Sequence, residues 1–230
     1  MAGFDRAEVL RYLGYHGQAL DAELLARLED VMRACEKAVK PRCVWRAFPL
    51  DRERGSDTCV WLEGMPQPLE GKDIAAHLQG AREAVLIACT LGSSYEREYQ
   101  RRVAVSPTEA LFFDAAASAL VESAASDAEE QVTCYAAERA CAVNRRYSPG
   151  YGDFPLTVQK GLLDALDAPR SIGLTATSEC LLVPTKSITA VMGVFDGAVS
   201  DAVRASCETC ALEGRCAWRK QGRTCCGDDA

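Results

Sequence analysis

Apolar positions in the first part of the chain alternate between helical spacing and short continuous runs. Between Asp21 and Pro41 they fall on one face of a helix, with aspartate at its start and proline after its end. Residues 72–79 fit a second, shorter helix. The other apolar runs are short enough for strands, with a turn or exposed loop at 52–57. The strands expected here are 43–50, 58–62 and 84–90.

A helical pattern returns after Ser106, which stands at an N-cap position with Pro107 at the first helical position. Helical positions continue to residue 124, a second helix is expected at 127–140, and a short amphipathic helix at 156–166. Three clustered strands follow, at 172–175, 180–183 and 187–195. Helices followed by clustered strands predict a mixed α+β fold rather than a regular βαβ repeat.

Composition and charge narrow the class of protein. The 230 residues are enough for one large domain or two small ones, and apolar residues make up 48% of them. The formal charge of −7 and the pI near 5.0 argue against a nucleic-acid binder, which usually shows a basic face. No apolar run approaches the ~20 residues that span a bilayer, and the first residues lack the features of a signal peptide. We therefore expect a cytoplasmic protein without a nucleic-acid or membrane partner.

The twelve cysteines divide into two groups. Seven are scattered singly among apolar neighbours, as expected for thiols that stay reduced in the cytoplasm. The other five crowd into the tail: Cys207, Cys210, Cys216, Cys225 and Cys226. A Cys-x-x-Cys pair is a common half-site for zinc, and thiolates also hold iron–sulfur clusters. The sequence thus predicts one domain at 1–206 and a tail at 207–230 that binds one metal centre, a reduced, partly ordered tail being the alternative.

The segment 144–154 combines two arginines, a proline, two glycines and two tyrosines. Pro149 fixes its own φ, whereas Gly150 and Gly152 tolerate positive φ and let a ligand approach the backbone. The predicted loop is rigid and offers backbone groups, a cation and a phenol to something bound. An ordinary surface turn is the alternative, with Asp153 as the N-cap of the helix that follows it.

Part of this loop, Arg146-Tyr147-Ser148-Pro149-Gly150-Tyr151, resembles the Arg-x-x-Pro-Gly-Tyr signature of the activation (reactivation) domain of cobalamin-dependent methionine synthase. The similarity continues through 173–175 and 182–187, covers roughly 81–195, and has a weaker N-terminal match at 11–14. It implies a single activation-domain-like fold, with a twisted, largely antiparallel sheet and packed helices ahead of the Cys-rich tail. The ordered combination of motifs carries the resemblance; none of them does so alone.

The resemblance also implies a reaction. A domain of this family binds S-adenosylmethionine and caps cobalamin, so that inactive cob(II)alamin is reduced and methylated. Arg146 would hold the methionine carboxylate of the ligand, while Ser148 and Gly150 supply main-chain contacts. Tyr151 would lie near the upper face of the corrin, within reach of a cobalt-bound water. The contribution of the protein is placement of the methyl group opposite the metal.

Other charged residues have two interpretations each. The family has a helix-borne acidic residue near the adenosylmethionine amino group, and Glu122 is the candidate for it, with Glu129 and Glu130 also available. A solvated helix face is the alternative interpretation of Glu122. Arg145 is a second anion contact or, as we favour, a surface charge, and Lys186 is either a partner-facing cation or a ligand contact.

The sequence gives little support for a histidine-bound metal, a Rossmann-type methyltransferase or a dinucleotide-binding loop. His16 and His77 stand alone without a partner at metal spacing, so no histidine is evident that would coordinate cobalt, and cobalamin is expected on a partner. The chain has no acidic, glycine-rich run of the Rossmann methyltransferase type. The Gly92-Ser93-Ser94 turn lacks the repeated glycines of a dinucleotide loop.

The leading hypothesis is a stand-alone reactivation subunit, a component of the methyltransferase methionine synthase that acts with a cobalamin-bearing partner. The chain lacks the cobalamin-, folate- and homocysteine-binding modules that accompany this domain, so it is expected to act in trans. Its expected partners are a truncated methionine synthase or another corrinoid protein, and an electron donor such as flavodoxin or ferredoxin. One alternative is a metal-binding reductive activator or interaction protein for corrinoid enzymes, with an iron–sulfur cluster or zinc at the tail. A third is an S-adenosylmethionine-binding sensor.

Overall fold

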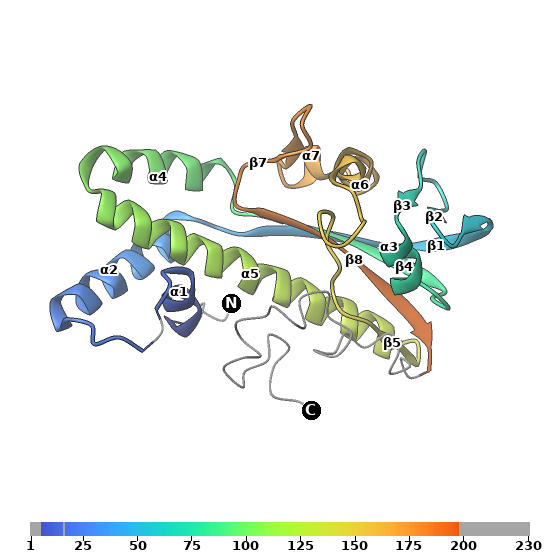
Figure 1. Ribbon diagram of the computed structural model, residues 1–230, viewed down its shortest axis with the longest axis horizontal. Coiled ribbons are helices and arrows are strands. Elements are labelled where there is room, and N and C mark those ends of the chain that lie inside the picture. Colours follow the sequence, from blue (N-terminus) through green and yellow to red (C-terminus); the bar gives the residue numbers. More distant parts are fainter. Residues whose placement is uncertain (1–5, 16, 198–230) are drawn as a thin grey trace.

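The computed structural model describes residues 6–15 and 17–197, and the sheet at its centre is entirely antiparallel (Figure 1). Six strands lie in the order β3-β2-β1-β4-β8-β5. Their bounds are β1 Arg42–Ser56, β2 Cys59–Leu62, β3 Leu69–Glu70, β4 Glu83–Thr90, β5 Cys141–Val143 and β8 Ser187–Asp196. A separate two-stranded sheet pairs β6 (Thr175–Ala176) with β7 (Leu182–Val183).

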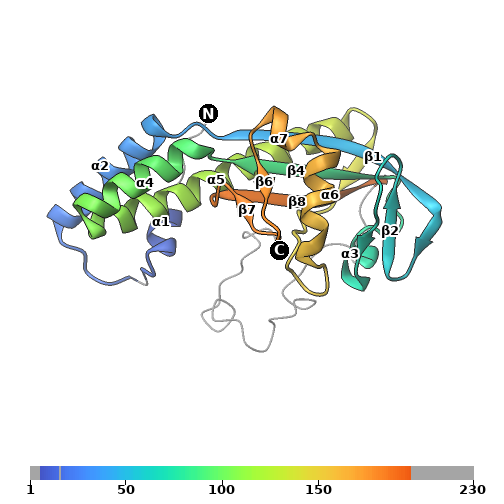
Figure 2. The same ribbon diagram turned by 90° about the horizontal axis from the view of Figure 1, so that it is seen from above.

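Helices cover both faces of the large sheet. The long helix α5 runs along one face, and α6, α7 and the β6–β7 sheet lie over the other (Figures 1 and 2). The helices α1 and α2 pack on α5 at one end of the molecule, as does α4. The bounds are α1 Arg6–Tyr12, α2 Ala22–Ala38, α3 Lys72–His77, α4 Ser93–Val105, α5 Pro107–Ala137, α6 Gln159–Ala165 and α7 Ala168–Ser171, with a 3-10 turn, η1, at Leu156–Val158.

Two helix starts follow directly from local chemistry. The Asp21 carboxylate accepts a hydrogen bond from the N–H of Glu23 at the start of α2. The Ser106 hydroxyl accepts one from the N–H of Glu109 at the start of α5, and Pro107 occupies the first helical position. Both side chains satisfy donors that have no partner inside the helix. These two starts were predicted from the sequence and are confirmed.

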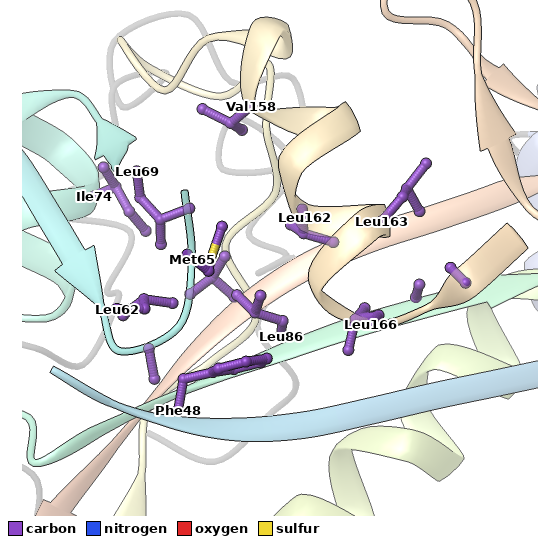
Figure 3. Close-up of a cluster of buried hydrophobic side chains, with 14 of the residues drawn as sticks. Phe48, Leu62, Met65, Leu69, Ile74, Leu86, Val158, Leu162, Leu163 and Leu166 are labelled. Carbon is purple, nitrogen blue, oxygen red and sulfur yellow. The ribbon is translucent and has the colours of Figure 1, made fainter. Parts of the chain in front are cut away.

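The strand β4 divides the core between the two faces of the sheet. Alternate side chains of a strand point to opposite faces. Leu86 packs under α6 in a cluster of large apolar side chains around Phe48 and Leu162 (Figure 3). Val85 and Ile87 instead pack against α5, whose contact surface is mostly alanine. Because these side chains are small, the backbone of α5 lies close to the sheet. Polar side chains of α5 can therefore reach residues at the edge of the sheet.

The α+β class and the largely antiparallel sheet are confirmed, but several element predictions were wrong. Helix α5 is continuous for 31 residues, so the second helix expected at 127–140 is part of it. The loop expected at 52–57 mostly belongs to β1, which continues to Ser56 beside β2. The strand expected at 172–175 is reduced to β6, because Ile172 ends α7. Helix α4 and strand β5 were not predicted.

No helix within the described ranges is long and apolar enough to cross a membrane. His16 and the cysteines of the tail lie outside those ranges, as does the boundary expected at residue 206.

Candidate functional site

The loop at 144–154 begins as an extra strip of backbone along the edge of the sheet. The side-chain carbonyl of Asn144 accepts a hydrogen bond from the N–H of Gly193 at 2.6 Å, and its amide donates to the carbonyl of His77 at 2.7 Å. Tyr147 exchanges two backbone hydrogen bonds with Val191 of β8, at 2.9 and 2.8 Å. The sheet thus fixes the backbone on both sides of Arg146.

Arg146 extends from this edge toward α5. Its Nε donates to Oε2 of Glu129 at 2.7 Å, and Nη1 lies 3.4 Å from Oε2 of Glu122. A third contact joins Nη2 to the hydroxyl of Ser126 at 3.5 Å. The Arg146 side chain is 21% exposed, and the two glutamates remain 45% (Glu122) and 30% (Glu129) exposed. The result is a half-buried cation between two carboxylates that solvent still reaches.

The spacing on α5 explains which glutamates meet Arg146. Positions 122, 126 and 129 are four and three residues apart, so they lie on one face of the helix. The sequence prediction placed Glu122 first, and the structure brings it beside Arg146. Glu129 makes the shorter contact. Glu130 forms no ion pair with Arg146 within the described chain. Helical spacing alone could have ranked Glu129 with Glu122.

Tyr147 points the opposite way and anchors the loop to the other face of the sheet. Its ring stacks on His77, with ring centroids 5.1 Å apart, and on the buried Phe154 at 6.0 Å. Its hydroxyl donates to the carbonyl of Tyr151 at 3.1 Å. Burial raises the pKa of Tyr147 to about 12, and the nearby carboxylate of Asp73 adds to the shift. The phenol therefore stays neutral and acts as an anchor.

Two glycines turn the chain between Arg146 and Phe154. Gly150 has φ of 97° and its N–H donates to the carbonyl of Phe154 at 2.7 Å. Gly152 has φ of 53°, and a side chain there would overlap the carboxylate of Asp73 and come within 2.6 Å of the Tyr147 hydroxyl. Glycine is required at this position both by the left-handed backbone and by the close approach.

The prediction that Asp153 caps the helix that follows it is wrong. Its carboxylate accepts the N–H groups of Lys72 and Asp73 at 2.7 and 2.9 Å, so it caps α3 from a distant part of the chain. The Asp73 carboxylate in turn accepts the N–H of Asp153 at 3.1 Å. The N–H groups of Asp73 and Lys72 hold the pKa of Asp153 below its usual range. This reciprocal pair fastens the far end of the loop to α3.

Tyr151 lies at the exposed tip of the loop. Its side chain is 65% exposed, and its ring centroid is 6.3 Å from that of Tyr147. Its phenol makes no hydrogen bond within the described chain. Ser148 contributes its carbonyl to the turn, accepting the Tyr151 N–H at 3.2 Å. The structure therefore groups Arg146 with Glu122 and leaves Tyr151 facing solvent.

The remaining candidates occupy other places. Lys186 binds the carboxylate of Asp114 and the hydroxyl of Ser118, at 3.0 and 2.8 Å, so it links the segment before β8 to α5. Arg145 is exposed, in agreement with the surface interpretation. Burial lowers the pKa of His77 to about 4, which keeps this stacked ring neutral. Ser93 begins α4, directly after Gly92.

A metal centre is not formed by the described part of the chain. No group of three or more histidine, cysteine, aspartate or glutamate side chains there could hold a metal ion. Cys207, Cys210, Cys216, Cys225 and Cys226 lie outside it. The metal site at the tail therefore stays a prediction of the sequence.

Comparison with known proteins identifies the fold. No protein-family model matches the chain, and no curated protein sequence matches it. A solved structure of the MetH reactivation domain bound to AdoHcy matches with a TM-score of 0.61 and 17% sequence identity, covering 96% of this chain and 82% of that one. The chain has the fold of the MetH reactivation domain. The reactivation-domain fold is the one implied by the motif around Arg146, so that expectation is confirmed.

Proposed function

We propose that this protein is a stand-alone reactivation subunit that binds S-adenosylmethionine and supports reductive methylation of cob(II)alamin on a partner protein. The observation that carries the proposal is the position of Arg146, held between Glu122 and Glu129 at the sheet edge of a reactivation-domain fold. The domain of known structure with this fold was solved with AdoHcy bound. AdoHcy and S-adenosylmethionine share the same amino-acid group.

The charges around Arg146 suit an amino-acid group. Such a group carries a carboxylate and an ammonium on one carbon. The planar fork of Arg146 can bind both oxygens of the carboxylate. A glutamate released from Arg146 can then accept the ammonium. Binding therefore exchanges one set of ion pairs for another and leaves no unpaired charge in a half-buried place, where an unpaired charge would be costly.

The backbone of the loop supports the same ligand. Ser148 and Gly150 border the turn next to Arg146, and Gly150 carries no side chain that would keep a ligand from its backbone. We assign to these residues the main-chain contacts of the ligand. S-adenosylmethionine supplies the methyl group, whereas this chain orients it and limits the access of water.

Tyr151 is assigned to the cobalamin of the partner. Its ring is exposed at the tip of the loop, and Leu156, 42% exposed, lies against the adjacent Gly150. A flat aromatic ring with a polar end suits the surface of a corrin, which is broad and largely apolar. We propose a truncated methionine synthase or another corrinoid protein as the partner, with flavodoxin or ferredoxin as the electron donor.

Binding of S-adenosylmethionine is tested by calorimetry on the full chain. Arg146→Ala should weaken binding by about 1.5–3 kcal/mol, the usual contribution of a charge-assisted hydrogen bond. Arg146→Lys should restore only part of it, because an ammonium does not reproduce the fork. The matched control is Arg145→Ala, which changes the neighbouring exposed arginine and should leave the affinity unchanged. Equal losses at both positions, or no heat with the unaltered protein, would contradict the proposal.

The action on a partner is tested by reconstitution. A methionine synthase without its reactivation domain is inactivated as cob(II)alamin and supplied with S-adenosylmethionine and a reductant, with and without this protein. We expect activity to return only with the protein, and not with Arg146→Ala. Equal recovery in both tubes would rule out the reactivation role. If the ligand still bound by calorimetry, the protein would be a sensor instead.

A further inference from the structure

Two cysteines face each other across the centre of the large sheet. Cys43 of β1 and Cys89 of β4 are direct partners in the antiparallel register. The register is unbroken on both sides of this pair, from Arg42 opposite Thr90 to Pro49 opposite Glu83. Because opposed residues of an antiparallel pair point to the same face, both thiols lie on the side of the sheet covered by α5.

The strand register places this pair in the range of Cα separations that a disulfide requires. Directly opposed antiparallel residues have Cα atoms about 4.5–5.5 Å apart, and disulfides need about 4.4–6.8 Å. Both sulfur atoms also point at the same acceptor. The Sγ of Cys43 lies 3.4 Å from the carbonyl oxygen of Ala124, and that of Cys89 lies 3.8 Å from it. The two sulfurs can therefore approach each other without a shift of either strand.

The two thiols differ in exposure and in the direction of their pKa shifts. Cys43 is exposed, whereas Cys89 is buried. The neighbouring Cys89 thiol lowers the pKa of Cys43, although burial and Asp127 oppose the shift. The nearby Cys43 thiol, followed by burial, raises the pKa of Cys89, while Arg146 lowers it and Glu122 raises it to a smaller extent. An accessible thiol that ionises more readily beside a buried one is the usual arrangement of a redox-active pair.

We propose that Cys43 and Cys89 form a redox-active dithiol that oxidises reversibly to a disulfide joining β1 and β4. This inference goes beyond the proposed methyl-transfer role and does not depend on it. With a small-molecule disulfide such as oxidised glutathione, the Cys43 thiolate attacks one sulfur and releases one glutathione thiolate, which takes up a proton. The Cys89 sulfur then loses its proton, attacks the Cys43 sulfur and releases the second glutathione. Two protein thiols are oxidised and one glutathione disulfide is reduced to two thiols.

The position of the pair places it beside the candidate ligand site. Ala124, whose carbonyl receives both S–H groups, lies on α5 between Glu122 and Ser126. Both of these side chains contact Arg146. Oxidation removes two hydrogen-bond donors from the backbone of this helical turn. Oxidation of the dithiol therefore changes the hydrogen bonding of the turn of α5 that faces Arg146.

Peptide mapping tests the disulfide directly, despite the many other cysteines. The full chain is treated with oxidised glutathione, denatured, alkylated with iodoacetamide and digested with trypsin without reduction. Cleavage after Arg42, Arg46, Arg82 and Arg97 releases the peptides 43–46 and 83–97, each with one cysteine. We expect these peptides to be joined, with a mass lower by two hydrogens than their sum, and to separate after reduction. Recovery of both as separate alkylated peptides would overturn the proposal.

Three variants test the order of attack. Cys89→Ser should stop the reaction at a glutathione adduct on peptide 43–46, because the second thiol is missing. Cys43→Ser should leave Cys89 unmodified, because the exposed thiol is missing. Cys134→Ser is the matched control, since this exposed cysteine of α5 lies elsewhere on the helix, and the joined peptides should still form. An adduct on Cys89 in the Cys43→Ser variant would contradict the assignment of Cys43 as the attacking thiol.

Discussion

Arg146 and Tyr151 belong to one short loop, yet their side chains differ in burial and in pairing. Arg146 is half-buried and already paired with two carboxylates of α5. Tyr151 is 65% exposed, and its phenol makes no hydrogen bond within the described residues. The backbone between them is fixed by β8 at one end and by α3 at the other. A single rigid loop thus presents one group to the interior and one to the outside.

Under the proposed function, this difference corresponds to two kinds of ligand. A ligand that binds Arg146 has to displace Glu122 or Glu129, so it must bring a negative charge that replaces the one it displaces. A small zwitterion does this, whereas a large surface does not. Whatever binds Tyr151 meets a side chain without internal partners and displaces only water. This combination suits a small amino-acid ligand on one side of the loop and a protein-borne cofactor on the other.

The largest expected effect comes from removing the anchor between the two sides. Phe154→Ala should lower the free energy of unfolding by about 3–5 kcal/mol, because Phe154 is 1% exposed and stacks on Tyr147. It should also weaken S-adenosylmethionine binding, since the turn that follows Arg146 loses its packing against Phe154, while β8 still holds the backbone beside Arg146. Urea unfolding and calorimetry measure the two effects. The control Leu156→Ala, two residues further on and 42% exposed, should cost about 1 kcal/mol or less. Equal losses would show that the loop is not anchored through Phe154.

An intermediate effect is expected from pH, through His77. Burial lowers its pKa from the ordinary 6.5 to about 4, so below pH 6.5 the unfolded chain takes up a proton that the folded chain does not. Stability should therefore fall as the pH drops from 6.5 toward 4, by about 2 kcal/mol at pH 5. Asp153, whose pKa is lowered in the folded state, adds a loss at still lower pH.

The variant His77→Gln isolates this contribution. Its unfolding free energy should fall less steeply between about pH 7 and pH 5 than that of the unaltered protein, because the proton-binding group is gone. Only the slopes are compared, since the variant also loses the stacking on Tyr147. Parallel slopes would show that His77 is not held neutral by burial.

The smallest effect on this chain by itself is expected from Tyr151→Phe. Only the exposed hydroxyl is lost, so stability should stay within about 0.5 kcal/mol and S-adenosylmethionine affinity should be unchanged. The reduction or spectrum of cob(II)alamin in the complex with a partner should change. Arg146→Ala should show the reverse pattern. A loss of ligand affinity at Tyr151 equal to that at Arg146 would show that the two sides of the loop are not separate.

Elements with strong local signals could be predicted from the sequence. The alternation in β8, the apolar run of β4 and the Ser106-Pro107 start of α5 all led to correct elements. Helix α4 was missed because few of its side chains are apolar and only Tyr95 is buried. The division of α5 near Ser126 and Asp127 was wrong because polar residues there looked like a break, whereas they face solvent and Arg146 within one continuous helix.

The site was predictable in its parts but not in its connections. The motif selected Arg146 and Tyr151 as candidates, and the helical pattern placed the candidate Glu122 on a helix, where it meets Arg146. Asp153 caps α3 through Lys72 and Asp73, which lie 81 and 80 positions before it in the chain. No local sequence pattern predicts such a contact. The same holds for Cys43 and Cys89, which are single cysteines in the sequence and become neighbours only through strand pairing.

The position of β8 in the sheet affects how the chain folds while it is being synthesised. It is the last strand of the described residues, yet it lies between β4 and β5, which the ribosome makes earlier. While α4 to β7 are being added, one edge of β4, whose side chains are mostly apolar, has no partner and is open to pairing with other chains. The backbone on both sides of Arg146 also lacks part of its support during this time, because Asn144 and Tyr147 bond to β8. A nascent chain therefore covers this edge of β4 and fixes the backbone around Arg146 in the same late step.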